Sequence, residues 1–198
     1  VEQAIRTALA RVPADRYASV AEFAAALASP EAFRAAARSV AVLPFLSLSG
    51  DPENEYFADG ITEDVIAQLS KIRSLKVISR TSVMMFKNRD RSLREIGALL
   101  SAATLLEGSV RRVGDRVRIV AQLIDAETDR HLWAETYDRQ LTDIFAIQSD
   151  VALQIASALR AELSPDEERR IHREPTRDVQ AYQLYLQGRH WFVSHTAE

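Results

Sequence analysis

The sequence predicts a domain of the α/β (α+β) class, with a mixed sheet of about five strands and three packing helices. Strand-like and helix-like patterns alternate between residues 39 and 100, which is typical of strands joined by helices. Three strand patterns then follow in direct succession, as in an antiparallel meander. A long helical repeat closes this part of the chain near residue 163, and helical segments flank it at both ends.

The alternating part supplies two strands and two helices. VAVLPFL, residues 40–46, is a short apolar run that suits a buried strand. EYFADGITEDVIAQLSKI, residues 55–72, carries apolar residues at helical spacing from position 61 onward. LKVIS, residues 75–79, predicts the second strand, and SLREIGALL, residues 92–100, predicts a helix that opens on a capping box.

The Asp59-Gly60 pair raises the possibility of a phosphate site. A glycine turn that leads into a helix can hold an anion on free backbone N–H groups. Asp59, Glu63 and Asp64 would place carboxylates on those same groups, and no lysine or arginine adjoins them in the sequence. We therefore expect Asp59 to cap the helix and Gly60 to supply a tight turn.

The three successive strand patterns are 103–113, 116–125 and 130–138, joined by Gly114-Asp115 and by the loop AETD. A two-residue turn at Gly114-Asp115 pairs Val113 with Arg116, Arg112 with Val117 and Arg111 with Arg118. A four-residue AETD loop then sets Arg118 opposite Tyr137 and Gln122 opposite Trp133. Alternation along the strands divides the sheet into an apolar face for the helices and a polar face.

The polar face is the candidate partner-binding surface. Its members are Arg111, Arg118, Gln122, Trp133, Glu135 and Tyr137. Two arginines directly opposite one another are unfavourable unless something compensates them. One hypothesis is an acidic or aromatic partner. The alternative is that Glu107 and Glu135 neutralise the arginines while the two aromatic residues pack under the last helix or the C-terminal segment.

The composition excludes several kinds of chemistry. The chain has 198 residues, a formal net charge of −3 and no cysteine, which argues against general affinity for nucleic acid and excludes thiolate metal sites. Its four histidines lack metal-ligand spacing, and no glycine-rich phosphate loop or nucleophile elbow occurs. We therefore predict no catalytic, cofactor-binding or metal-binding residues, and no apolar run reaches the ~18 residues that a membrane span needs.

The central segment resembles the TolB N-terminal-like (TolB-N/FlgO-like) domain of bacterial signalling proteins. The matching phrases are SVAVLPF, YFADGITEDVIAQLSK, LLEGSVRR, GDRVRI, AQLIDAETD and LWAETYDR, in the order of that family. The resemblance implies a compact α/β module with a sensory or scaffolding role and no established set of catalytic residues.

The N-terminal segment ALARVPADRYASVAEFAAAL resembles the C-terminal end of a bacterial serine/threonine protein kinase domain. Arg16 matches the structural arginine of that family, whose glutamate partner lies outside this chain, as do all the kinase catalytic motifs. An unrelated helical hairpin is the alternative. AYQLYLQGRHWF, near the C-terminus, resembles the first helix of a tetratricopeptide repeat array.

These patterns predict five segments. They are truncated kinase helices at 1–29, a linker at 30–38, the TolB-N-like domain at 39–164, a charged linker at 165–177 and a truncated first repeat helix at 178–198. We expect the last helix of the α/β domain to start at Thr142 and end before Pro165. The repeat helix should be loosely held unless it docks on the α/β domain.

The resemblances imply a non-catalytic, cytoplasmic regulatory or scaffolding region of a serine/threonine kinase. ATP and Mg²⁺ would belong to the parent kinase, and the expected partners are its own kinase domain, its repeats and an unknown protein. The sequence leaves the oligomeric state open. Two other hypotheses are a structural spacer and a small-molecule or nucleotide sensor with a pocket near Pro44 to Asp51 and Ser79 to Ser82.

Overall fold

The structure is a computed structural model. It describes isolated positions between residues 5 and 24, and residues 38–49, 53–88, 90–173, 176 and 178–195. The chain divides into two compact units, Val1–Ala37 and Arg38–Glu198. The expected boundaries of the kinase helices and of the linker at 30–38 lie largely outside the described residues.

Little of the first unit is described. Arg16, the predicted structural arginine, donates a hydrogen bond from Nε to the carbonyl oxygen of Ala10 over 2.8 Å. Three apolar residues of this unit, Ile5, Leu9 and Val20, are exposed. Phe23 is partly buried, and its ring lies 5.7 Å from that of Tyr17 between centroids.

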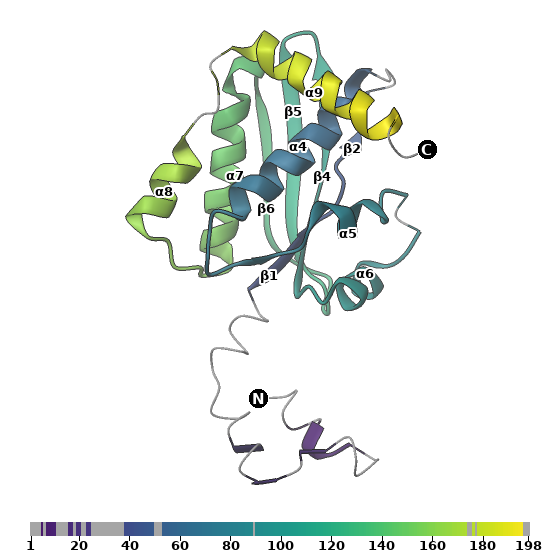
Figure 1. Ribbon diagram of the computed structural model, residues 1–198, viewed down its shortest axis with the longest axis vertical. Coiled ribbons are helices and arrows are strands. Elements are labelled where there is room, and N and C mark those ends of the chain that lie inside the picture. The colour runs from purple at the N-terminus through teal and green to yellow at the C-terminus, as the bar shows by residue number, and fades with distance from the viewer. Residues whose placement is uncertain are drawn as a thin grey trace. The chain divides into compact units, whose positions relative to one another are not determined.

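The second unit is built on a mixed sheet of six strands (Figure 1). The strands are β1 (Ser39–Val42), β2 (Leu46–Ser47), β3 (Lys76–Val77), β4 (Thr104–Val113), β5 (Arg116–Asp125) and β6 (Arg130–Gln140). Their order is β3-β1-β4-β5-β6, with β2 paired to β4. The pairs among β1, β2, β3 and β4 are parallel, whereas β4, β5 and β6 form an antiparallel meander. The predicted fold class is confirmed.

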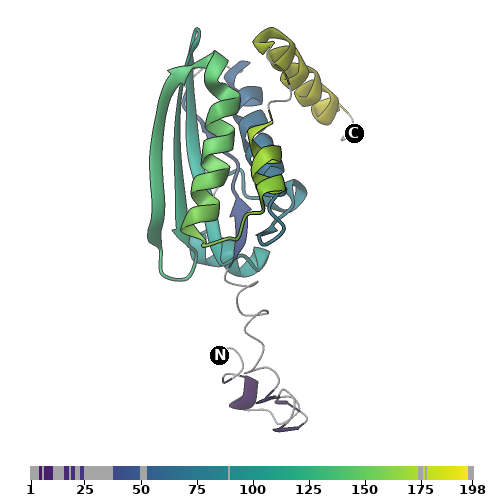
Figure 2. The same cartoon turned by 90° about the vertical axis from the view of Figure 1, so that its left-hand side faces the viewer.

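Helices pack on this sheet in layers. They are α4 (Glu53–Leu69), α5 (Arg80–Met84), α6 (Leu93–Leu100), α7 (Ile144–Ala158), α8 (Pro165–His172) and α9 (Val179–His195), with a 3-10 turn η2 (Leu141–Asp143) before α7. Seen edge-on, α4 and α7 lie on one side of the long strands, and α9 lies outside α4 (Figure 2). None of the helices in the described ranges is long and apolar enough to cross a membrane.

The core fills the space between the sheet and α4 with α7. Phe57 and Ile61 of α4, Ile144 of α7 and Ile119 and Leu123 of β5 are all at most 1% exposed. Burial of each of these large apolar side chains stabilises the folded state by about 1.5–3 kcal/mol. This layer fixes the position of α4, on whose outer side the candidate site is built.

The expected turn at Asp59-Gly60 is absent, because α4 starts at Glu53 and runs through both residues. Asp59 is therefore not an N-cap. This position of the helix is a glycine because α9 packs closely against it. A Cβ atom at residue 60 would lie 2.6 Å from Cδ2 of Leu186. The glycine in the middle of this helix therefore allows close packing of two helices and does not form a turn.

The meander register is as predicted between β4 and β5 but wrong by one residue in most of β6. Arg111 lies opposite Arg118, and Asp125 lies opposite Arg130. A β-bulge between Leu123 and Ile124 of the β5–β6 ladder then shifts β6, so that Tyr137 faces Ile119 and Trp133 faces Leu123. Because side chains alternate, the shift by one residue moves the β6 residues to the opposite face.

The C-terminal part also differs from expectation. The segment 165–177 was expected to be a charged linker, yet it contains α8, which opens on a capping box formed by Ser164 and Glu167. Ile171 of α8 is fully buried, and its carbonyl oxygen accepts a hydrogen bond from Ser149 Oγ of α7 over 2.8 Å. α7 begins at Ile144, because residues 141–143 form the 3-10 turn. α9 packs against α4.

Candidate functional site

The candidate site is the contact between α4 and α9, together with the turn after α5. Its centre is apolar. Leu186 of α9 is only 3% exposed and sits over Gly60 of α4. No residue larger than glycine fits at position 60 without displacing Leu186, so the sequence of α4 is adapted to this contact.

A buried polar cluster lies on one side of this centre. Tyr182 of α9 donates a hydrogen bond from its hydroxyl group to Asp64 Oδ2 of α4. Gln148 Nε2 of α7 donates to the same carboxylate oxygen over 2.9 Å and to the Tyr182 hydroxyl over 3.1 Å. The Tyr182 ring also meets the edge of Phe145, with 4.8 Å between centroids. Three helices are thereby joined through one tyrosine.

Burial sets the protonation of this cluster. It raises the pKa of Asp64, and the hydrogen bonds from Tyr182 and Gln148 offset only part of the rise. Burial and the nearby Asp64 charge also raise the pKa of the Tyr182 hydroxyl, which stays a donor at neutral pH. Burial of the Asp64 carboxylate therefore costs desolvation free energy, and the hydrogen bonds from Tyr182 and Gln148 reduce this cost.

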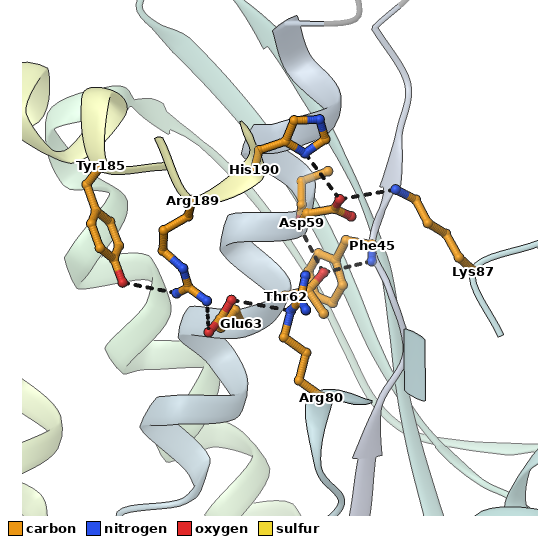
Figure 3. Close-up of polar contacts among 10 residues, drawn as sticks. Phe45, Asp59, Thr62, Glu63, Arg80, Lys87, Tyr185, Arg189 and His190 are labelled. Carbon is orange, nitrogen blue, oxygen red and sulfur yellow. Dashed lines mark hydrogen bonds and ion pairs between the residues drawn. The ribbon is translucent and has the colours of Figure 1, made fainter. Parts of the chain in front are cut away.

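On the other side of the centre, Glu63 of α4 joins two arginines from different elements (Figure 3). Its Oε1 accepts a hydrogen bond from Nη2 of Arg189 in α9. Its Oε2 lies 3.3 Å from Nε of Arg80 in α5, a distance typical of an ion pair, although the angles do not fit a hydrogen bond. Burial lowers the pKa of Arg189, but its bonds to Glu63 and Tyr185 outweigh that effect and raise it.

A second ionic cluster lies one turn earlier on α4. Lys87, in the turn that follows α5, places Nζ 2.7 Å from Glu55 Oε1 and 3.1 Å from Asp59 Oδ2. Figure 3 shows the contact with Asp59. His190 of α9 approaches the same Asp59 oxygen to 4.0 Å. Burial lowers the pKa of Lys87, yet its two carboxylate partners raise it overall, so Lys87 is charged at neutral pH.

One carboxylate oxygen of Asp59 lacks a hydrogen-bond partner. Its side chain is 13% exposed, and its Oδ1 atom is buried without a hydrogen-bond partner. The nearby Thr62 hydroxyl is already committed, because it donates to the carbonyl oxygen of Ala58 and accepts from the backbone N–H of Phe45. The carboxylate is thus held mainly by the charge of Lys87.

These side chains border two pockets. One, of about 290 Å³, is lined by Tyr56, Gly60, Met84 and the ionic residues just described. The other, of about 420 Å³, is lined by Pro44, Phe45 and neighbouring residues of the β1–β2 segment. Glu55, Asp59 and Lys87 border both pockets. Within the ranges the structure describes, no group of three or more histidine, cysteine or acidic residues could hold a metal ion.

The structure does not bring the six predicted partner-binding residues together. Arg111, Arg118 and Gln122 share one face of the sheet, but the bulge places Trp133, Glu135 and Tyr137 on the face that carries the helices. Tyr137 is buried and donates from its hydroxyl group to Asp150 Oδ2 of α7 over 2.8 Å. The prediction of one polar face that includes both aromatic residues is wrong.

One of the two opposed arginines, Arg118, faces a carboxylate that the sequence argument did not name. Asp138 lies opposite Arg118 in β6 and makes a 2.7 Å ion pair with Arg116. Hydrogen bonding and attraction from Arg116 lower the pKa of Asp138, and Arg118 adds to this effect. Of the two predicted compensating carboxylates, Glu107 shares the face of the arginines, whereas Glu135 lies on the other face.

The α4–α9 site was missed because its partners are far apart in sequence. Glu63 and Arg189 are 126 residues apart, and Asp64 and Tyr182 are 118 residues apart. No lysine or arginine adjoins Asp59, Glu63 and Asp64 along the sequence. In space Lys87, Arg80 and Arg189 all lie beside these carboxylates.

Comparisons with known proteins found similarity to one named enzyme and to several solved structures. No family model matches the chain. It is 50% identical over 151 residues to putative adenylate cyclase 3 of Rhizobium meliloti (strain 1021), a match that covers 76% of this chain and 26% of that protein. The chain thus spans about a quarter of the length of this relative.

Several solved structures are similar at low identity. They include lipoprotein GNA1162 of Neisseria meningitidis (TM-score 0.46, 20% identity, 60% of this chain and 96% of that chain). TolB of Acinetobacter baumannii gives a TM-score of 0.47 and 16% identity over 61% of this chain and 28% of that chain. LpoB of E. coli gives 0.42 and 15% over 50% of this chain and 55% of that chain.

The similarity to this relative corrects the prediction of what kind of longer protein the chain belongs to. A serine/threonine kinase was predicted from the N-terminal segment, but the relative at 50% identity is named as a putative adenylate cyclase. The prediction of a parent kinase is therefore wrong, whereas the ATP and Mg²⁺ expected for the parent protein stay a prediction. No comparison supports a kinase domain or tetratricopeptide repeats in this chain.

Proposed function

We propose that the α/β domain is a non-catalytic regulatory module that acts by protein–protein contact within a longer signalling protein. The observation that carries the proposal is the docking of α9 on α4, where Gly60 leaves space for Leu186. The domain thereby holds a helix that lies outside its own sheet and helix layers, which suits a part that fixes the position of other segments.

The composition of the contact supports a docked state that can also be released. Burial of Leu186 contributes about 1.5–3 kcal/mol. Against this, Asp64 lies in a buried position, where the desolvation that raises its pKa makes the charged carboxylate costly. The ion pair of Glu63 and Arg189 is partly exposed, and such pairs contribute about 0–1 kcal/mol. A modest net docking free energy lets another protein segment compete for either surface.

The relative supplies the context for this role. It is named as a putative adenylate cyclase, and this chain matches about a quarter of it. We infer that the longer protein forms a cyclic nucleotide and that this chain modulates the rate. The cytoplasmic location stays a prediction.

The proposal is tested in a chimera that carries this chain in place of the matching part of the R. meliloti protein. Gly60→Leu should undock α9 and change the rate of cyclic AMP formation from ATP. Ala67→Leu introduces the same leucine side chain at an exposed position of the same helix, adding three carbon atoms instead of four, and should leave the rate unchanged. Equal rates for the two variants, or a wild-type chimera without cyclase activity, would contradict the proposal.

A second candidate function is that of a small-molecule sensor. The observation that favours it is the pocket of about 420 Å³ beside Pro44 and Phe45, close to where the sequence predicted one. Lys87 borders this pocket and could bind an anionic group on exchanging one of its carboxylate partners. A thermal-shift screen with nucleotides, cyclic nucleotides, amino acids and phospho-sugars tests it. A saturable shift that Lys87→Ala abolishes would support the sensor, and a flat screen would argue against it.

A further inference from the structure

The outer face of α9, opposite the face that docks on α4, is apolar. Leu184 is 61% exposed, and Trp191 and Phe192 are each 63% exposed. Tyr182 and Leu186, by contrast, are buried against the domain. Figure 2 shows α9 as the outermost layer of the second unit, so this face points away from the sheet. Large apolar side chains gathered on one outer face typically mark an interaction surface.

Side-chain size alternates along this face. Ala181, Leu184, Gly188 and Trp191 follow one another at spacings of three, four and three residues, which places them on one side of the helix. The order is small, large, small, large. Gly188 lies in mid-helix, has an ordinary helical backbone and has no atom within 4 Å of the position that a Cβ would occupy. Among the residues that the structure describes, none therefore requires glycine there.

Gly60 shows what a mid-helix glycine does elsewhere in this molecule. There the missing side chain leaves room for a leucine of the helix that crosses it. Around Gly188 an equivalent hollow exists, a pocket of about 540 Å³ lined by Leu184, Tyr185, Arg189 and Phe192 as well as the glycine. It has the form of a hole between side chains of one helix, into which a side chain of a second helix can pack.

The size pattern is complementary to itself. Leu184 and Gly188 are equally far, two residues each, from the level of residue 186, and Ala181 and Trp191 are each five residues from it. In an antiparallel pair related by a two-fold axis at that level, Leu184 of one copy faces Gly188 of the second copy, and Ala181 faces Trp191. A two-fold interface requires this reciprocity. A parallel pair would instead set glycine against glycine and tryptophan against tryptophan.

We propose that two copies of this chain pair through the outer faces of their α9 helices, antiparallel, with each Leu184 packed over the Gly188 of the other copy. The proposal does not rest on the function proposed above, because it uses the face of α9 that points away from α4. A contact made by one helix from each copy is small in area, so the dimer is weak and reversible.

Sedimentation velocity of the chain over a wide range of concentrations tests the pairing. The wild type should shift from monomer to dimer as concentration rises. Gly188→Leu fills the hole and should remain monomeric, although the space around position 188 lets the monomer fold, which circular dichroism checks. The reciprocal variant Leu184→Gly/Gly188→Leu exchanges knob and hole and should dimerise again. A wild type that stays monomeric, or a double variant that fails to recover dimerisation, would overturn the proposal and leave this face to a helix of another protein.

Cross-linking tests the register. The chain contains no cysteine, so introduced cysteines are the sole thiols. A mixture of Leu184→Cys and Gly188→Cys chains should form mixed dimers rapidly with a short thiol-reactive cross-linker. A mixture of Ala181→Cys and Leu184→Cys is the control, because those positions would be offset by seven residues, about 10 Å at the rise of an α-helix. Equal yields from the two mixtures would exclude the antiparallel register.

Discussion

Shortening Leu186 should release α9 from α4. Leu186→Ala removes three carbon atoms from a side chain that is 3% exposed, which costs about 2.4 kcal/mol at ~0.8 kcal/mol for each carbon. Gly60 offers no side chain that could fill the space, so a cavity term raises the cost to about 3–4 kcal/mol. A loss of 3 kcal/mol corresponds to a factor of about 100 in the docking equilibrium.

Hydrogen exchange of the α9 amides is the assay, because the loss should appear as local opening and not as global unfolding. We expect exchange in 179–195 to rise by up to about 100-fold in Leu186→Ala. Leu184→Ala is the matched control, since it is the same chemical change on the same helix at a residue that is 61% exposed. Its effect should stay within about 0.5 kcal/mol when measured at low protein concentration. Similar exchange in both variants would refute the assigned packing of α9.

Three further predictions concern charge. Burial raises the pKa of Asp64, so its contribution to stability is present at low pH and is lost as pH rises from 3.8 through the folded-state pKa. Asp64→Asn should therefore unfold at the same or a higher temperature than the wild type at pH 7, and a clearly lower midpoint would contradict the assigned burial. Backbone N–H donors from Arg73 and Ser164 lower the pKa of Glu167 to about 2, so its contribution is present above pH 4.5 and is lost as pH falls towards 2. Glu167→Gln should flatten this acid limb in pH-dependent thermal melts, whereas an unchanged limb would argue against the α8 cap. Asp138→Ala removes the carboxylate that pairs with Arg116 and faces Arg118, so its unfolding midpoint should fall at low salt and recover at high salt. A loss independent of salt would show that Asp138 acts by packing.

The local parts of the fold could be predicted because their determinants lie close together in the sequence. The turn at Gly114 has a φ of +59° and fixes the pairing of Arg111 with Arg118. The Ser92 and Glu95 capping box forms as expected. The bulge in the β5–β6 ladder has no comparable pattern in the sequence. The resulting shift of one residue moves Tyr137 to the other face of the sheet.

The candidate site could not be predicted in the same way. Asp59-Gly60 has the composition of a turn, and only the position of Leu186, far along the chain, explains why a helix carries glycine there. Sequence distance also concealed the pairing of Glu63 with Arg189. α8 is different, because the order Ser164, Pro165 and Glu167 is a helix start that could have been recognised.

The central claim is that α9 lies against α4 with Leu186 over Gly60, and nuclear Overhauser effects measured on the chain in solution test it most directly. The structure predicts strong cross-peaks between the Leu186 methyl protons and the α-protons of Gly60, because the leucine carbons lie within 3.1 Å of the space that a Cβ would fill. Their absence from a sample in which α4 is folded would contradict the docking, and with it the regulatory role proposed for the domain.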